Sequence, residues 1–272
     1  MTLDKSAARI QEMFGQIAGR YDFLNRLLSL GIDRSWRRKT VELVPPLDDS
    51  PILDVCTGTA DLALAYWQAS KGTAAIVAAD FCQPMLAIAQ EKCRRAGALS
   101  ASSVPLLRRS SAEDNPLPGT ACGQAVAQPA VAAPGVTLLE ADTLRLPFPA
   151  DTFQIVSVAF GLRNVADTDA GLREMVRVCR PGGRVAVLEF STPTAWPFGA
   201  MYGWYFQHVL PRIGQALARN RQAAYNYLPQ SVGRFPQGEA LAGQMRAAGM
   251  QDVKYWPFTF GVATLYVGEK RD

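Results

Sequence analysis

The sequence has very little histidine and no close pair of cysteines. His208 is the one imidazole in 272 residues, and the five cysteines, an odd number, include no Cys-x-x-Cys pair. Structural zinc sites are built from clusters of such residues, and small secreted domains depend on paired cysteines. We therefore expect no metal site and no disulfide framework, and a protein of the reducing cytoplasm.

Long apolar runs and strong net charge are also missing. No run approaches the roughly 20 residues that span a bilayer, and the first residues lack the apolar stretch of a secretory signal. Charged residues make up 19% of the chain and the net charge is +4, which is too weak a balance to indicate a nucleic-acid partner. With 49% hydrophobic residues the chain can form a large core. We expect one soluble domain over residues 1–272.

Five short apolar runs alternate with helical segments. Runs that are apolar on both faces, with helices between them, are typical of a parallel sheet in an α/β fold. The last segment, "DVKYWPFTFGVATLYVGEK", predicts a strand pair that turns near Gly261. The result is a doubly wound sheet that ends in an antiparallel pair. The five runs are 51–56, 74–80, 136–142, 153–160 and 183–190.

Three regions depart from this alternation. Residues 1–46 have helical spacing, broken at "LSLGIDRSW", and we expect them to form an N-terminal helical cap. Residues 100–134 are rich in Ala, Ser, Pro and Gly and follow neither period, so they are expected to be an inserted surface loop. Residues 193–235 are aromatic-rich and predict a helical lid over the substrate.

The turn after the first predicted strand points to a ligand at the carboxyl end of the sheet. In an open α/β sheet a ligand binds there, and Gly58 lets the backbone approach while Thr59 offers a hydroxyl. Asp54, late in the strand, can accept hydrogen bonds from loop amides or bind a ligand ammonium group. Cys56 and Asp61 replace glycines of the dinucleotide fingerprint. This makes a nucleotide-dependent oxidoreductase a poor alternative.

Acidic residues also end the next two predicted strands. Asp80 lies 22 residues after Gly58, where a carboxylate can bind both ribose hydroxyls of an adenosine. Asp142 and Thr143 follow the third strand, where they can bind an adenine amino group. An aspartate after a strand can instead be only a helix cap. The joint pattern favours a ligand with hydroxyls, an amine and positive charge, and S-adenosylmethionine has all three.

Several longer stretches resemble a known family. "RYDFLNRLLSLGIDRSWR", "ILDVCTGTAD", "LRLPFPADTFQIV", "AFGLRNV", "RVCRPGGRVAVLEFSTP" and "FQHVLPRIG" are similar to the class I S-adenosylmethionine-dependent methyltransferases that C-methylate the quinol ring in menaquinone and ubiquinone biosynthesis. The resemblance covers the chain outside 100–134. It implies a Rossmann-like, mostly parallel seven-stranded sheet with an antiparallel C-terminal strand.

The resemblance also implies which residues bind the cofactor S-adenosylmethionine. The family's contacts fall on Thr59, Asp80 and the pair Asp142–Thr143. Ala159 stands where the family usually has a serine before "FGLRN", so one side-chain hydrogen bond to the cofactor is expected to be missing.

The same comparison implies a ring-binding end of the site. Arg163 and Asn164 would face the quinol, with Arg163 stabilising a phenolate oxygen or orienting a water and Asn164 binding the second ring oxygen. Tyr21 could close the pocket from the N-terminal helix. His208 is a candidate base on its ordinary pKa, although a lone histidine among aromatic residues is more often packed in a core.

Arg163 has a structural alternative. A salt bridge to Asp167 or Glu174 of the following helix would give it no part in chemistry. The resemblance favours the functional interpretation.

The expected activity is methylation of demethylmenaquinol, with a polyprenyl quinol as the partner. The alternatives are 2-polyprenyl-6-methoxy-1,4-benzoquinol as the substrate, and a non-catalytic methyltransferase-like scaffold of a quinone-biosynthesis complex. The apolar tail of such a substrate implies peripheral membrane contact through residues 196–214, and a homo-oligomer is left open.

Overall fold

The computed structural model describes most of the chain, with gaps in the regions that flank the sheet. The predicted insertion (100–134) and the predicted lid (193–235) fall mainly outside it, and so do Tyr21 and His208. The described residues are 6, 9–16, 18, 29, 31–100, 133–193, 227 and 230–271.

One seven-stranded sheet organises the fold, in the order β3-β2-β1-β4-β5-β7-β6. β1 to β5 are parallel, β7 is antiparallel to β5, and β6 is antiparallel to β7. This confirms the predicted mostly parallel sheet with an antiparallel C-terminal strand. The strands are β1 (Ile52–Val55), β2 (Ala75–Asp80), β3 (Gly135–Glu140), β4 (Phe153–Ala159), β5 (Cys179–Phe190), β6 (Gln251–Phe258) and β7 (Ala263–Glu269).

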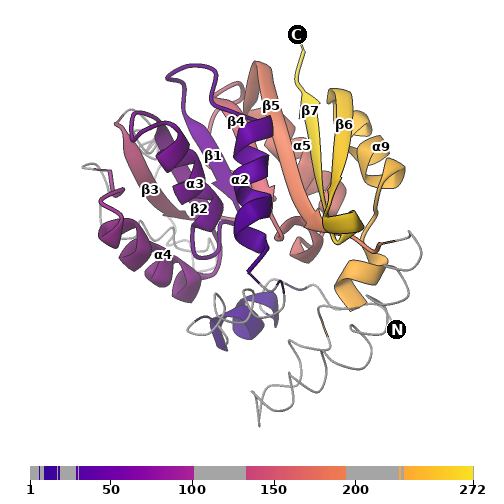
Figure 1. The fold of residues 1–272 in the computed structure, drawn as a ribbon, viewed down its shortest axis with the longest axis horizontal. Coiled ribbons are helices and arrows are strands. Elements are labelled where there is room, and N and C mark those ends of the chain that lie inside the picture. Colours follow the sequence, from indigo (N-terminus) through magenta and orange to yellow (C-terminus); the bar gives the residue numbers. More distant parts are fainter. Residues whose placement is uncertain are drawn as a thin grey trace, which may run out of the picture.

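Helices cover both faces of the sheet (Figure 1). The helix α2 begins two residues after Gly31, whose left-handed backbone (φ 76°) makes the predicted break in the N-terminal segment. Pro84 stands in the first turn of α4, as expected. The helices are α2 (Asp33–Leu43), α3 (Asp61–Ala69), α4 (Gln83–Arg95), α5 (Thr168–Val178) and α9 (Glu239–Ala247), with short 3₁₀ turns η1 (Leu162–Asn164) and η3 (Thr259–Gly261), and residues 9–16 are also helical.

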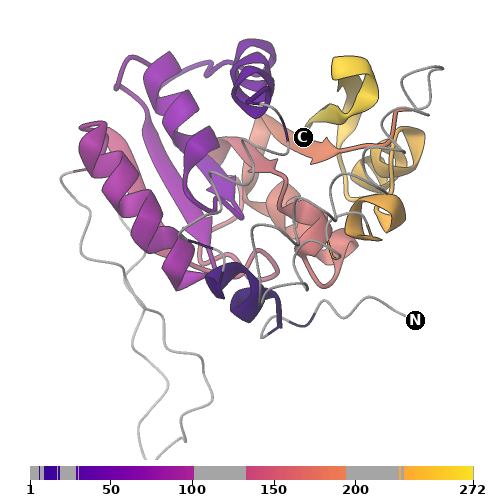
Figure 2. The ribbon, with the colours of Figure 1, turned by 60° about the horizontal axis from the view of Figure 1, so that its bottom comes forward.

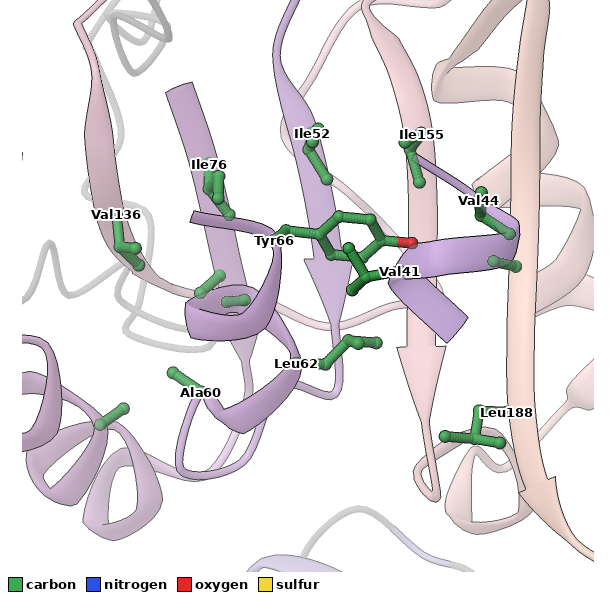
Figure 3. Packing of buried hydrophobic residues seen from close by; sticks show 14 of the residues in the cluster. Val41, Val44, Ile52, Ala60, Leu62, Tyr66, Ile76, Val136, Ile155 and Leu188 are labelled. Carbon is green, nitrogen blue, oxygen red and sulfur yellow. The ribbon is translucent and has the colours of Figure 1, made fainter. Parts of the chain in front are cut away.

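Two apolar layers hold the helices to the sheet. Alternate side chains of each strand point to opposite faces, so Ile52 packs with α2, α3 and α4 while Leu53 and Val55 pack with α5 and α9. Figure 3 shows the first layer, with the ring of Tyr66 among Ile52, Val41 and their neighbours. Each fully buried Leu, Ile or Val contributes about 1.5–3 kcal/mol, so these layers fix the strand ends that carry the site.

The direction of the chain reverses between β1 and β4. From β1 the chain winds outward through β2 and β3, then returns to place β4 on the other side of β1. Ligands of open α/β sheets bind outside the carboxyl ends of the strands at such a point. In Figure 2 residues 9–16 lie near this end of the sheet, beside α4. The fold therefore predicts one location for the functional site.

Candidate functional site

A pocket opens at the carboxyl ends of β1, β2 and β4. Apolar side chains from residues 9–16, including Ile10 and Phe14, and Met85 of α4 form part of its wall. Most of the side chains predicted to contact the cofactor, and one predicted to contact the ring, also line it. These are Gly58, Asp80, Asp142, Thr143, Ala159 and Asn164.

Asp80 is the most firmly held polar group of the pocket. Its Oδ2 accepts the backbone N–H of Gly58 at 2.8 Å and its Oδ1 accepts that of Cys82 at 2.8 Å. Burial raises the pKa of its carboxyl to about 6, opposed by these backbone hydrogen bonds. A carboxylate oxygen accepts two hydrogen bonds, so each oxygen keeps a lone pair for a ligand hydroxyl.

Asp142 and Thr143 line the pocket just after β3, the strand next to β2. Asp142 is exposed, and its Oδ1 accepts the backbone N–H of Leu144 at 2.9 Å. Thr143 is buried, and its hydroxyl lies 3.3 Å from the sulfur of Cys56, which also lines the pocket. Asp142 therefore stabilises its own turn and still presents a carboxylate to the pocket.

Asp54 and Thr59 lie behind the pocket wall. Asp54 is 1% exposed and accepts hydrogen bonds from the hydroxyls of Thr57 (2.6 Å) and Ser157 (2.8 Å). The hydroxyl of Thr59 accepts from Lys92 Nζ at 3.0 Å. Neither side chain is among those that line the pocket. Their predicted ligand contacts stay predictions, while their hydrogen bonds hold the turn after β1.

Asp54 makes the stability of the fold depend on pH. Burial raises its pKa from 3.8 to about 6, against the hydrogen bonds from Thr57 and Ser157. Between about pH 4 and 6 the folded protein keeps a proton that the unfolded chain has lost, so this contribution to stability falls as the pH rises. Asp54→Asn removes the titration. Relative to wild type, the free energy of unfolding of the variant should rise by about 3 kcal/mol from pH 4 to pH 7. Urea denaturation of both proteins at pH 4 and pH 7 measures these free energies. If the variant differs from wild type by the same amount at both pH values, the titration does not belong to Asp54.

Close packing joins the ends of β1 and β4. A Cβ atom at Gly161 would lie 2.3 Å from the Cβ of Cys56, so only glycine fits between the two strands there. Cys56, Ala60 and Phe160 have positive φ angles of 49°, 63° and 59°. Non-glycine residues in this region cost about 1–3 kcal/mol each, and such residues cluster at binding sites.

Arg163 forms a buried ion pair with Glu189, a partner that was not predicted from the sequence. Its Nη1 donates to Oε2 of Glu189 at 2.9 Å and to the carbonyl of Phe160, and its backbone N–H donates to Oε1 of Glu189 at 3.2 Å. The two side chains are 6% and 1% exposed. The guanidinium also lies 5.3 Å from the ring centre of Phe190. Arg163 does not line the pocket, although Asn164 does.

The two salt-bridge partners considered for Arg163 from the sequence, Asp167 and Glu174, were wrong. Asp167 caps α5, because its Oδ1 accepts the N–H of Ala170 at 2.9 Å. Glu174 pairs with Arg177 at 2.7 Å. Arg163 instead pairs with Glu189, because η1 follows β4 and β5 is the next strand of the sheet.

Sequence reasoning missed two features of this end of the site. They are Glu189 and a group of packed aromatic rings. The rings of Phe160 and Phe190 are 4.4 Å apart, and Trp36 lies 5.9 Å from Phe160. An acidic residue within the apolar run "VAVLEF" was the available signal for Glu189, because a buried carboxylate requires a partner.

Comparison with known proteins identifies the family. The ubiE/COQ5 methyltransferase family matches residues 1–122 and 119–270. The chain belongs to this family. The two matches meet, with a short overlap at 119–122, within the predicted insertion (100–134).

Two relatives show how far the similarity of this family member extends. The chain is 43% identical over 258 residues to the demethylmenaquinone methyltransferase of Thermus thermophilus, covering 95% of this chain and all of that one. It is 40% identical over 268 residues to the ubiquinone/menaquinone biosynthesis C-methyltransferase UbiE of Geobacter sulfurreducens, covering 98% and 91%.

Solved structures share the methyltransferase fold. A SAM-dependent methyltransferase of Thermotoga maritima, described as a possible histamine N-methyltransferase, aligns with a TM-score of 0.59 at 15% identity, covering 96% of this chain and 99% of that one. A putative S-adenosyl-L-methionine-dependent methyltransferase of Methanococcus maripaludis aligns at 0.57 and 13% identity, covering 100% and 98%. At such identities the likeness concerns the fold alone.

Within the described residues, no group of three His, Cys, Asp or Glu side chains is placed to hold a metal ion. No helix in the same part of the chain is both long and apolar enough to cross a bilayer.

Proposed function

We propose that this methyltransferase transfers a methyl group from S-adenosylmethionine to a ring carbon of demethylmenaquinol. The observation that carries the proposal is the similarity, over nearly the whole of both chains, to the Thermus demethylmenaquinone methyltransferase. The pocket agrees with it, because Asp80 on the predicted cofactor side and Asn164 on the predicted ring side line one space.

The residues of the pocket fit S-adenosylmethionine. Asp80 has lone pairs for a ribose diol, the exposed carboxylate of Asp142 can accept from an adenine amino group, and apolar side chains such as Met85 can cover the base. When bound, the cofactor supplies a methyl group on a positively charged sulfur. Since Ala159 has no hydroxyl, it contributes only backbone and its methyl group to this wall.

The ring end has to hold a quinol and favour its deprotonated form, the quinolate. The negative charge of the quinolate raises the electron density of the ring carbon beside the oxygen, which is the carbon that takes the methyl group. The Oδ1 of Asn164 is buried and has no hydrogen-bond partner within the described part of the chain, so it can accept a ring hydroxyl. The Nε–H of Arg163 is likewise buried and unpaired there, and it is the donor we assign to a ring oxygen. A guanidinium stays protonated, so Arg163 stabilises charge and is not a base.

Tyr21 and His208 remain proposals of the sequence analysis. Both lie outside the described residues. Tyr21 is proposed to close the ring pocket, and His208 is the second choice as a base.

The benzoquinol of ubiquinone synthesis is the second candidate substrate. The name of the Geobacter relative includes both ubiquinone and menaquinone, which supports the benzoquinol as a second candidate. A non-catalytic scaffold has less support, because the chain belongs to a family of methyltransferases.

A direct assay separates these functions. Labelled methyl transfer from S-adenosylmethionine is followed under reducing conditions with short-tailed demethylnaphthoquinol and with the 6-methoxy-benzoquinol at equal concentrations. We expect kcat/KM for the naphthoquinol to be at least tenfold higher. A preference for the benzoquinol would overturn the assignment of substrate, and turnover of neither despite tight cofactor binding would favour the scaffold.

Two further proposals concern contact with a membrane and self-association of the protein. A polyprenyl tail partitions into lipid, which supports peripheral contact. In the described residues, Phe260 of η3 is a large apolar side chain that is 64% exposed. Liposome flotation with and without quinol tests the contact, and absence from the lipid fraction in both would count against it. Light scattering tests the oligomeric state.

A further inference from the structure

Tyr227 carries a buried hydroxyl that the fold does not use. The oxygen is shielded from solvent and has no hydrogen-bond partner within the described part of the chain. Burial raises the pKa of this hydroxyl, so it stays protonated at neutral pH. A buried, unsatisfied hydroxyl costs about 1–3 kcal/mol, and a group kept at such a cost calls for an explanation.

Charged residues of the ring end lie around this hydroxyl. Arg163 and Glu189 act electrostatically on it, and so does Arg9 of the N-terminal helical residues. Arg163 and Glu189 are the buried ion pair at the ends of β4 and β5.

Hydrogen bonds give the same location for the segment that contains Tyr227. Tyr227 stands four residues before Ser231. Gln237, a little further along, accepts the backbone N–H of Thr192 just after β5 and donates to the carbonyl of Val232. The hydroxyl of Tyr227 therefore lies near the carboxyl end of β5, on the side of the proposed ring site.

Three buried polar atoms at this edge have no hydrogen-bond partner among the residues that the structure describes. They are the hydroxyl of Tyr227, the Nε–H of Arg163 and the Oδ1 of Asn164. One is a donor, one is an acceptor and the hydroxyl can be both. A quinol hydroxyl also donates and accepts, so its two ring oxygens match this set of groups.

We propose that Tyr227 is a substrate-binding residue whose hydroxyl forms a hydrogen bond with a ring oxygen of the quinol, in one site with Arg163 and Asn164. This inference rests on the proposed function, because a quinol ring is the ligand. It assigns a role to a residue that has none in the cofactor pocket. The hydroxyl would give the quinol an uncharged hydrogen-bonding group beside Arg163. The charge of Arg163 is balanced by Glu189.

Tyr66 provides a matched control. Its hydroxyl is also buried and unpaired within the described residues, but it lies in the core among Ile52, Val41 and their neighbours (Figure 3). Tyr66→Phe and Tyr227→Phe therefore each remove one buried hydroxyl, in the core for Tyr66 and near the charged groups of the ring end for Tyr227. A purely structural hydroxyl predicts the same result for both variants.

The experiment measures binding before turnover. Short-tailed demethylnaphthoquinol is titrated into wild type, Tyr227→Phe and Tyr66→Phe, each saturated with S-adenosylhomocysteine under reducing conditions. We expect the Kd for the quinol to rise at least tenfold in Tyr227→Phe and less than twofold in Tyr66→Phe. The Kd for S-adenosylhomocysteine should stay within twofold, and the melting temperature of both variants should equal or exceed that of wild type.

A change in the ligand gives a second, independent reading. The dimethyl ether of the same quinol cannot donate from its ring oxygens, so we expect it to bind wild type at least tenfold more weakly than the quinol. Quinol binding within twofold of wild type in Tyr227→Phe would overturn the inference.

The outcome also separates this inference from the proposed function. If wild type binds the quinol without methylating it, the proposed activity fails, and the comparison of the two variants still decides the role of Tyr227. If wild type binds no quinol at all, both fail.

Discussion

Glu189→Ala is expected to lower the free energy of unfolding by about 3–5 kcal/mol. The carboxylate accepts the guanidinium and the backbone N–H of Arg163, and the N–H of Phe190 at 3.1 Å. Removal of the carboxylate leaves a buried guanidinium without a counter-charge, which is the costly case for a buried pair. Methyl transfer should fall at least 100-fold, because Arg163 would no longer be held in place. Chemical denaturation and the labelled assay measure the two effects.

A double variant separates stability from function. In Arg163→Met/Glu189→Leu both charges are replaced by apolar side chains of similar size, an exchange that is often neutral or stabilising. We expect the double variant to be more stable than Glu189→Ala, although the backbone N–H groups of Arg163 and Phe190 lose their acceptor. Methyl transfer should stay at least 100-fold reduced while cofactor binding is retained. A stable double variant with normal activity would mean that the pair is only structural.

Asp80→Ala is expected to weaken binding of S-adenosylmethionine by at least about 100-fold. Each hydrogen bond from a cofactor hydroxyl to the carboxylate contributes about 1.5–3 kcal/mol, and two are lost. The carboxylate also accepts the N–H groups of Gly58 and Cys82, so the turn after β1 loses support as well. Isothermal titration calorimetry measures the affinity. The control is Asp142→Ala on the exposed wall, for which the loss should be about tenfold or less.

The same carboxylate predicts how cofactor binding depends on pH. Burial raises the pKa of Asp80 to about 6, and only the ionised form accepts two ribose hydroxyls without an added proton. In wild type the affinity should therefore fall as the pH decreases below about 6. In Asp80→Ala this dependence should disappear. A pH dependence that survives in the variant would assign the titration to another group.

The sheet could be predicted from the sequence because its strands are buried on both faces. All five apolar runs became β1 to β5, and the turn near Gly261 lies between β6 and β7 as expected. β5 begins at Cys179, four residues before the predicted run. Phe153 pairs with Cys179 and Ile155 with Arg184, so the segment with Pro181 and Gly182 bulges between them. Sequence alone cannot indicate that a strand continues through a bulge.

On the proposed cofactor side, most of the residues expected at the pocket do line it, and on the proposed ring side the partner of Arg163 was missed. Asp80 ends β2 and Asp142 stands two residues after the end of the neighbouring β3, so the topology of the sheet brings them together. Glu189 lies 26 residues from Arg163 and contacts it only because β5 is next to β4. Asp54 is in β1 and Thr59 in the turn after it, as expected, but their side chains hydrogen-bond to other protein groups and do not line the pocket. The direction of a side chain depends on tertiary packing that spacing does not show.

The identity of the methylated product tests the central claim most directly. Wild-type protein is incubated with S-adenosylmethionine carrying a ¹³C methyl group and short-tailed demethylnaphthoquinol under reducing conditions, and the product is examined by NMR. The account predicts a methyl resonance bonded to a ring carbon, formed by wild type and absent with Arg163→Met/Glu189→Leu. A methyl group on a ring oxygen, or no methylated quinol from a wild-type protein that binds both ligands, would contradict it.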